Sequence, residues 1–90
     1  QNSMGSNVET LYKILDNQAE ALEFSIRQES AVTQTPLMDL NLKDRLLVCC
    51  INRNGQIIIP RGQDYILPGD TVIVVTTLKG LRDISDILKK

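Results

Sequence analysis

The chain has 90 residues, the length of one small domain, and its 10 Lys+Arg against 11 Asp+Glu give a net charge of −1. This balance argues against a protein that grips a nucleic-acid backbone through a basic face. One Phe, two Tyr and no Trp also leave no platform for stacking bases. Histidine is absent, so the commonest general base and metal ligand is missing.

The first residues are polar and then become amphipathic. Residues 1–6 read as a linker or an expression-tag remnant, and because the chain begins with Gln we expect it to be a piece of a longer protein. Residues 7–18 predict a short N-terminal helix, capped by Asn7, whose apolar face carries Val8, Leu11, Tyr12 and Leu15. A helix this short must dock, either on its own sheet or on a partner chain.

From residue 19 to residue 90 we expect one domain. Alternation from Glu20 predicts a half-buried strand with an apolar face of Leu22, Phe24 and Ile26. After a polar connection over residues 29–34, Thr35 as cap and Pro36 in the first turn predict one or two helical turns.

A hairpin is predicted in the middle of the chain. Asn54-Gly55 separates two apolar runs, 46–51 and 57–59, and favours a type I′ turn because both central residues tolerate positive φ. Neither run alternates strictly, so we expect both faces of these strands to be covered.

The last third of the chain predicts two strands and a helix. Residues 64–67 suit a very short strand, Pro68-Gly69 suits a type II turn, and residues 71–77 form a β-branched strand. An apolar face over residues 78–88 predicts a helix capped by Thr77. The order helix, strand, short helix, hairpin, strand, helix predicts an α+β fold with a mixed sheet.

The chemistry-bearing motifs are few. No G-x-G-x-x-G, P-loop, G-x-S-x-G or zinc spacing is present, and no apolar run approaches the roughly 20 residues that span a bilayer. We expect no enzymatic activity, no metal and no membrane insertion. Cys49 and Cys50 are expected to be small buried residues of a reduced, cytosolic protein, on opposite faces of a strand, which argues against a vicinal disulfide.

Arg61, between Pro60 and Gly62, has two interpretations. It is either a surface residue that pairs with Asp64 or Asp70, or a rigidly held contact for an anion or partner. In the second interpretation the hairpin brings three further polar side chains to the same rim, which then receives a phosphate-bearing ligand: Lys43, Arg53 and Asn54.

Several segments follow one another in an order typical of one family. They are Val8-Glu9-x-Leu11-Tyr12, Ala19-Glu20-Ala21-Leu22-Glu23-Phe24, Pro36-Leu37-x-x-Leu40, Ile51-x-Arg53-x-Gly55-x-Ile57-Ile58-Ile59-Pro60-Arg61-Gly62 and Leu67-x-Gly69-Asp70-x-Val72-Ile73-Val74. Together they resemble the RCK-C (TrkA-C) domain of regulators of bacterial potassium uptake, from about Val8 to Leu88. The resemblance implies a small mixed sheet in the order β, short α, β, β, β, α.

The resemblance also implies partners and a location. Such domains form homodimers in the cytoplasm, follow a Rossmann-type nucleotide-binding domain, and lie at the inner face of the plasma membrane beneath a potassium channel subunit. No Rossmann fingerprint is present here, so no nucleotide cofactor is assigned to this chain. Two alternatives remain open: a domain of another cation antiporter or an anion transporter, and a purely structural dimerisation module without a ligand.

Some relatives bind cyclic di-AMP at the dimer interface of this domain. Lys43 stands where those relatives use Arg, and loses the bidentate fork, while Asn54 stands where they use His and brings no charge. Cyclic di-AMP is therefore the disfavoured ligand. The residues expected to line a ligand site of some kind are Leu37, Met38, Lys43, Leu47, Arg53, Asn54, Pro60 and Arg61.

Overall fold

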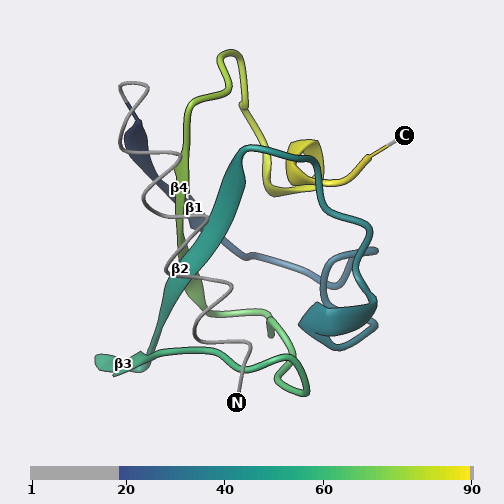
Figure 1. Ribbon diagram of the computed structural model, residues 1–90. Helices are drawn as coiled ribbons and strands as arrows, with labels where there is room; N and C mark the ends of the chain where they lie inside the picture. Colours follow the sequence, from purple (N-terminus) through teal and green to yellow (C-terminus); the bar gives the residue numbers. More distant parts are fainter. Residues whose placement is uncertain (1–18, 90) are drawn as a thin grey trace.

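The computed structural model describes residues 19–89. The linker expected at 1–6 and the helix expected at 7–18 lie outside these residues. Figure 1 shows a twisted sheet flanked by loops and short helical turns. The elements along the chain are β1 (Glu20–Ser25), the 3-10 helix η1 (Leu37–Asp39), β2 (Leu46–Arg53), β3 (Gln56–Ile58), β4 (Thr71–Thr76) and the 3-10 helix η2 (Ile84–Ile87).

The sheet has four strands in the order β1-β4-β2-β3. Both neighbours of β4, and the β2–β3 pair, run antiparallel. The prediction of a mixed sheet is therefore wrong. A parallel pair needs a crossover of a dozen or more residues, usually a helix, whereas β2 and β3 are joined by a tight turn and the chain then returns to place β4 between β1 and β2.

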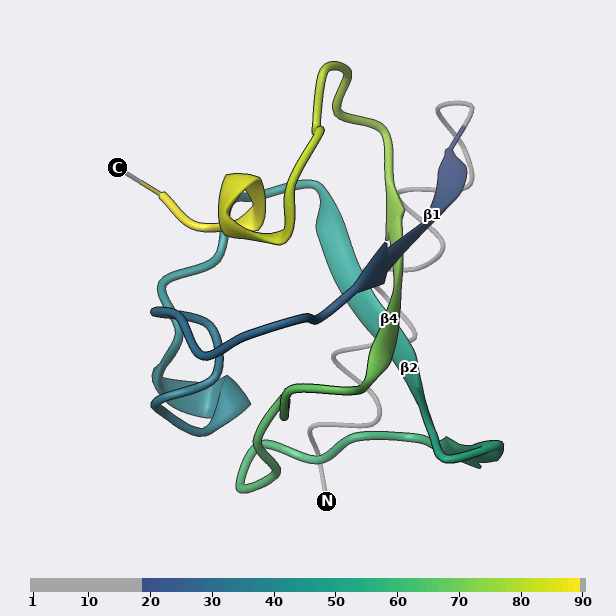
Figure 2. The same ribbon diagram turned by 180° about the vertical axis from the view of Figure 1, so that it is seen from behind.

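The hydrophobic core lies on one face of the sheet. Val72 and Val74 of β4 are fully buried there, beside Phe24 of β1 and Ile51 of β2. Five residues from outside the strands also belong to the cluster: Ile26, Val32, Ile66, Ile84 and Ile87. Figure 2 shows the loops and both 3-10 helices gathered on this side of the sheet. The half-buried strand predicted from Glu20 is confirmed.

The opposite face of the sheet stays outside this cluster. Leu47 and Cys50 of β2 and Ile73 and Val75 of β4 point to it and are only half-buried, and Ile57 of β3 is 62% exposed. The expectation that both faces are covered is thus wrong for the described part of the chain, because its loops and 3-10 helices all pack on the other side.

The predicted hairpin is confirmed in detail. Asn54 and Gly55 have φ values of 55° and 83°, as a type I′ turn requires, and the Gly55 N–H donates to Asn52 Oδ1 at 3.0 Å. The second predicted turn is also present, since Gly69 has a φ of 95° and the Asp70 N–H donates to the Leu67 carbonyl at 3.1 Å.

The helical predictions are only partly right. The first short helix is a 3-10 turn whose N-cap is Pro36, without a side-chain cap, so the cap assigned to Thr35 is wrong. Instead the loop before β4 holds this turn, because the Leu37 N–H donates to the Asp64 carbonyl at 2.9 Å. That loop contains the predicted strand at 64–67, which is not a strand, since its backbone pairs with η1.

The predicted C-terminal helix over 78–88 shrinks to η2. Gly80 adopts a φ of 82°, which breaks a helix, and η2 begins only after its N-cap Asp83, which forms a capping box with Asp86. Thr77 is not a helix cap: its N–H donates to the Arg45 carbonyl at 3.2 Å. After η2 the chain extends, and Leu88 forms an isolated bridge with Leu42.

Both cysteines differ from their prediction. The β2–β4 register shifts between Val48 and Cys50, so Cys49 is an extra residue in a β-bulge. Cys49 is exposed and Cys50 half-buried, and both thiols are free. A bulge interrupts the alternation of side chains, which is why the assumption of opposite faces and full burial fails here.

Candidate functional site

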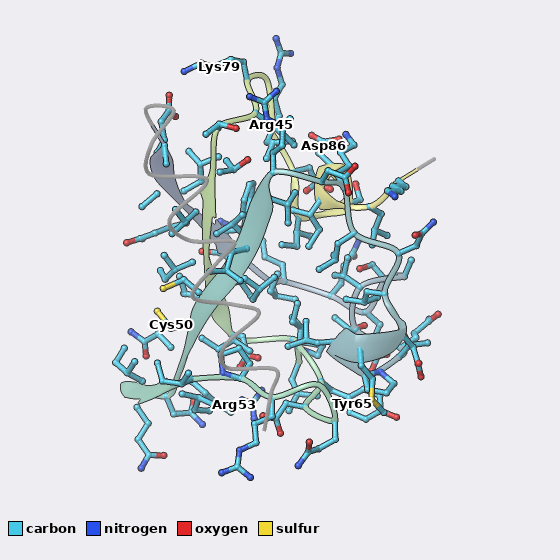
Figure 3. The ribbon with its side chains drawn as sticks, in the orientation of Figure 1. Arg45, Cys50, Arg53, Tyr65, Lys79 and Asp86 are labelled. Carbon is cyan, nitrogen blue, oxygen red and sulfur yellow. The ribbon has the colours of Figure 1, made fainter. Side chains whose placement is uncertain are left out.

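A partly buried ion pair joins the hairpin to the loop before β4. Arg53, the last residue of β2, donates from Nε to Asp70 Oδ1 at 2.9 Å and from one Nη to Oδ2 at 2.8 Å. The same Nη donates to the Tyr65 carbonyl at 3.0 Å, and Oδ2 also accepts the Leu67 N–H at 2.9 Å. This bidentate geometry is the strong form of a charge-assisted pair, and Figure 3 shows Arg53 beneath the sheet at the end of β2.

The two charges of this pair are unequally buried. The Asp70 side chain is 1% exposed and that of Arg53 is 32% exposed. Burial alone raises the pKa of Asp70, but the hydrogen bonds from Arg53 and Leu67 and the charge of Arg53 outweigh it, so the pKa lies below its ordinary value. The hydrogen bond with Asp70 raises the pKa of Arg53. The Arg53 side chain thus holds the loop before β4 in place.

A second set of contacts holds η1 against the same loop. The Met38 N–H donates to the Gly62 carbonyl at 2.9 Å, beside the bond from Leu37 to the Asp64 carbonyl. A Cβ added at Gly62 would lie 3.1 Å from the Met38 Cβ, so the two segments touch. Within the loop, Asp64 Oδ2 accepts the Arg61 N–H at 2.7 Å.

The contact between Arg61 and Asp64 therefore runs through the backbone. Asp70, the other partner considered for Arg61, is occupied by Arg53 instead. The hydrogen bond to Asp64 fixes the main chain of Arg61, and the residue as a whole is exposed to solvent.

The large exposed apolar side chains concentrate in these two segments and in β3. We use "loop surface" for η1 together with residues 59–67. Four of the five large exposed hydrophobic residues of the described chain lie in it, namely Met38 (68%), Ile59 (68%), Tyr65 (45%) and Leu67 (41%); the fifth, Ile57, is in β3. Exposed apolar side chains concentrated in one part of a small domain make the loop surface a candidate contact surface.

The structure divides the predicted ligand-binding residues into two groups. Leu37, Met38, Pro60 and Arg61 belong to the loop surface, and Arg53 and Asn54 lie at the adjoining end of β2. Lys43 and Leu47 lie at the opposite end of β2. Since β2 runs over 8 residues and a strand rises about 3.3 Å per residue, roughly 25 Å separates the two ends. One chain does not bring the rim of Lys43, Arg53 and Asn54 together.

Sequence reasoning missed several residues of this region. Asp70 was considered as a partner of Arg61, yet it is the buried partner of Arg53, and Ile59, Tyr65 and Leu67 were not assigned to any site. A carboxylate that follows Pro-Gly and precedes a β-branched strand was the available signal. Over residues 19–89 the structure holds no group of three or more His, Cys, Asp or Glu suited to a metal, and no helix long and apolar enough to span a membrane.

The family model of the TrkA-C domain matches residues 21–89. Trk system potassium uptake protein TrkA homolog 2 of Methanosarcina mazei is 32% identical over 68 residues, which make up 76% of this chain and 15% of that protein. The TrkA homolog of Pyrococcus abyssi is 30% identical over 73 residues, 80% of this chain and 32% of that protein. The chain thus spans a third or less of these relatives.

A solved structure titled "Structure of RCK domain with cda" has the same fold, with a TM-score of 0.55 and 24% identity over 66% of this chain and 81% of that one. The four-stranded sheet and the family match together define the class: a small TrkA-C-type domain. The chain belongs to the TrkA-C domain family, found in Trk-type potassium uptake proteins. The resemblance noted in the sequence is confirmed.

Proposed function

We propose that this chain is the cytoplasmic regulatory and dimerisation domain of a Trk-type potassium uptake system. The observation that carries the proposal is the loop surface, where Met38 and Ile59 are each 68% exposed on a backbone fixed by hydrogen bonds. A rigid apolar surface pairs with little entropic cost, because its main chain is already ordered. A second copy is its natural partner, since homodimers are the commonest assemblies of soluble proteins.

The split of the predicted ligand residues also favours a second copy. Lys43 and Leu47 lie at one end of β2 and Arg53 and Asn54 at the other, so a site that uses both groups has to draw them from two chains. Arg61 contributes an exposed guanidinium next to the apolar surface. The ligand class that fits is a small molecule with phosphate groups and an apolar or aromatic part.

The regulatory step follows from this arrangement. A ligand held between two copies shifts their relative orientation only if it binds one orientation more tightly than the other. The change then passes to the parts of the parent protein outside this chain: a Rossmann-type domain and, through it, a membrane channel subunit. We place the domain at the inner face of the plasma membrane by this attachment alone.

The test combines association and binding. Sedimentation gives the mass of the chain, and calorimetry at the same concentration screens cyclic dinucleotides, ATP and NADH. The proposal expects a dimer and heat from at least one phosphate-bearing compound, reduced at least tenfold in affinity by Arg61→Ala. Arg27→Ala is the matched control, because Arg27 is an exposed arginine on the segment after β1, outside the loop surface. A dimer silent to every compound supports the structural module without a ligand.

A further inference from the structure

The β-bulge in β2 places two thiols on the same side of the sheet. Val48 pairs with Val74 on the core face, so Cys49, the next residue, points to the other face. The bulge then adds one residue, and Cys50 pairs with Ile73, which also points away from the core. Figure 3 shows Cys50 projecting from β2 on the side away from η1 and the loops.

The ionisation of the Cys50 thiol also depends on its neighbour Cys49. Burial raises the pKa of the Cys50 thiol, and the charge of Cys49 and a hydrogen bond to its side chain raise it further. Because Cys49 is exposed and Cys50 half-buried, the pair is open to small molecules at one sulfur and shielded at the other.

Direct bonding of the two sulfurs fits this geometry badly. Cα atoms of adjacent residues are about 3.8 Å apart across a trans peptide, whereas disulfides need about 4.4 to 6.8 Å. An atom that bridges the two sulfurs removes this conflict, because each sulfur then bonds to the bridging atom instead of to the other sulfur.

The bridging atom must be soft and must need few ligands from the protein. Over residues 19–89 no third His, Cys, Asp or Glu completes a cluster with these thiols, which excludes a tetrahedral zinc site of four protein ligands. Thiolates select soft centres. A trivalent arsenical with one organic substituent needs two sulfurs and carries its own third bond.

We propose that Cys49 and Cys50 form a dithiol site for trivalent arsenicals and related soft centres that take two sulfur ligands from the protein. The step balances without an oxidant. Each thiol forms one S–As bond, and a monosubstituted arsenous acid loses its two As–OH groups, each leaving as water with the proton of one thiol. No electrons are transferred, and the ring that results encloses the Cys49–Cys50 peptide.

The experiment uses the whole chain and phenylarsine oxide. The chain has only 2 cysteines, so every thiol reaction is assigned to this pair. We expect intact-mass measurement to show one phenylarsenic group per chain, thiol titration to show both thiols lost, and 2,3-dimercaptopropanol to reverse the adduct. The Cys49→Ser and Cys50→Ser variants each bind at least a hundredfold more weakly, while circular dichroism reports their folding.

Three outcomes overturn the proposal. The first is binding by folded Cys49→Ser equal to that of the unaltered chain. The second is one thiol left free per bound arsenical, and the third is an arsenical that links two chains rather than one adjacent pair. Rapid formation of an intramolecular disulfide by diamide in the native state would likewise contradict the geometric argument.

Discussion

Replacing Asp70 with Asn removes one charge of the Arg53–Asp70 pair while keeping the shape of the side chain. Asn still offers an acceptor to the Leu67 N–H, but the two short bonds from Arg53, at 2.9 and 2.8 Å, lose their anionic acceptor. Breaking a fully buried pair costs about 3–5 kcal/mol. Because the Arg53 side chain is 32% exposed and still reaches water, we expect a smaller loss of about 2 kcal/mol.

The assay is thermal unfolding followed by circular dichroism. For a chain of this length about 1 kcal/mol corresponds to about 4–8 °C, so Asp70→Asn should lower the melting temperature by about 10 °C. The control is Asp64→Asn, whose carboxylate accepts one exposed backbone hydrogen bond, from Arg61. It should cost less than about 1 kcal/mol.

Arg53→Met gives the reciprocal test. It leaves the Asp70 carboxylate, 1% exposed, without its cation, and should therefore cost more than Asp70→Asn, about 3 kcal/mol. The reasoning is refuted if Asp70→Asn and Asp64→Asn melt at the same temperature. It is also refuted if Arg53→Met lowers the melting temperature less than Asp70→Asn does.

Four further predictions concern acid, the hairpin, the second 3-10 helix and the loop surface. Because the folded-state pKa of Asp70 is lowered, its contribution to stability is complete above the unfolded-state pKa and is lost as the pH falls through the folded value; the melting-temperature gap to Asp70→Asn should narrow below about pH 4. Gly55→Val should cost about 1–2 kcal/mol through backbone strain alone, since nothing lies within 4 Å of its Cβ position, whereas Gly55→Asn should cost little. Equal melting of these two variants would contradict the type I′ turn. Asp83→Ala, which breaks the capping box of η2, should lower stability by about 1 kcal/mol in urea unfolding, and an unchanged midpoint would count against that cap. Met38→Asp should leave the melting temperature of the monomeric state unaltered yet weaken self-association at least tenfold in sedimentation, and undiminished association would remove Met38 from the interface.

The features predictable from the sequence are those that depend on neighbours in the chain. Asn54-Gly55 and Pro68-Gly69 determine their turns through local φ preferences, and alternation from Glu20 determines which side of β1 is buried. The apolar face over residues 78–88 has helical spacing too, but Gly80 and the Asp83 cap restrict the helix to one turn.

The features that escaped prediction depend on distant parts of the chain. Arg53 and Asp70 are 17 residues apart in the chain. Only the placement of β4 beside β2 decides that Asp70, rather than Asp64, is the ion-pair partner of Arg53. The bulge at Cys49 likewise arises from pairing with β4, since nothing in the run 46–51 marks an extra residue.

The candidate site shows the same division between local features, which the sequence predicts, and features that depend on distant parts of the chain. Pro60 and Arg61 were singled out from local punctuation and Leu37 from the family resemblance, and backbone bonds do bring their segments together. Lys43 was grouped with Asn54 because a hairpin was expected to gather strand ends, yet the two residues flank opposite ends of β2. The length of that strand, rather than its residues, separates them.

The mass of the chain in sedimentation equilibrium, at about ten to a hundred micromolar, tests the account most directly, because an exposed apolar loop surface on a rigid backbone is its central claim. The account predicts twice the monomer mass for the unaltered chain and the monomer mass for a chain carrying Met38→Asp and Ile59→Asp. A folded, unaltered chain that stays monomeric across this range would contradict it.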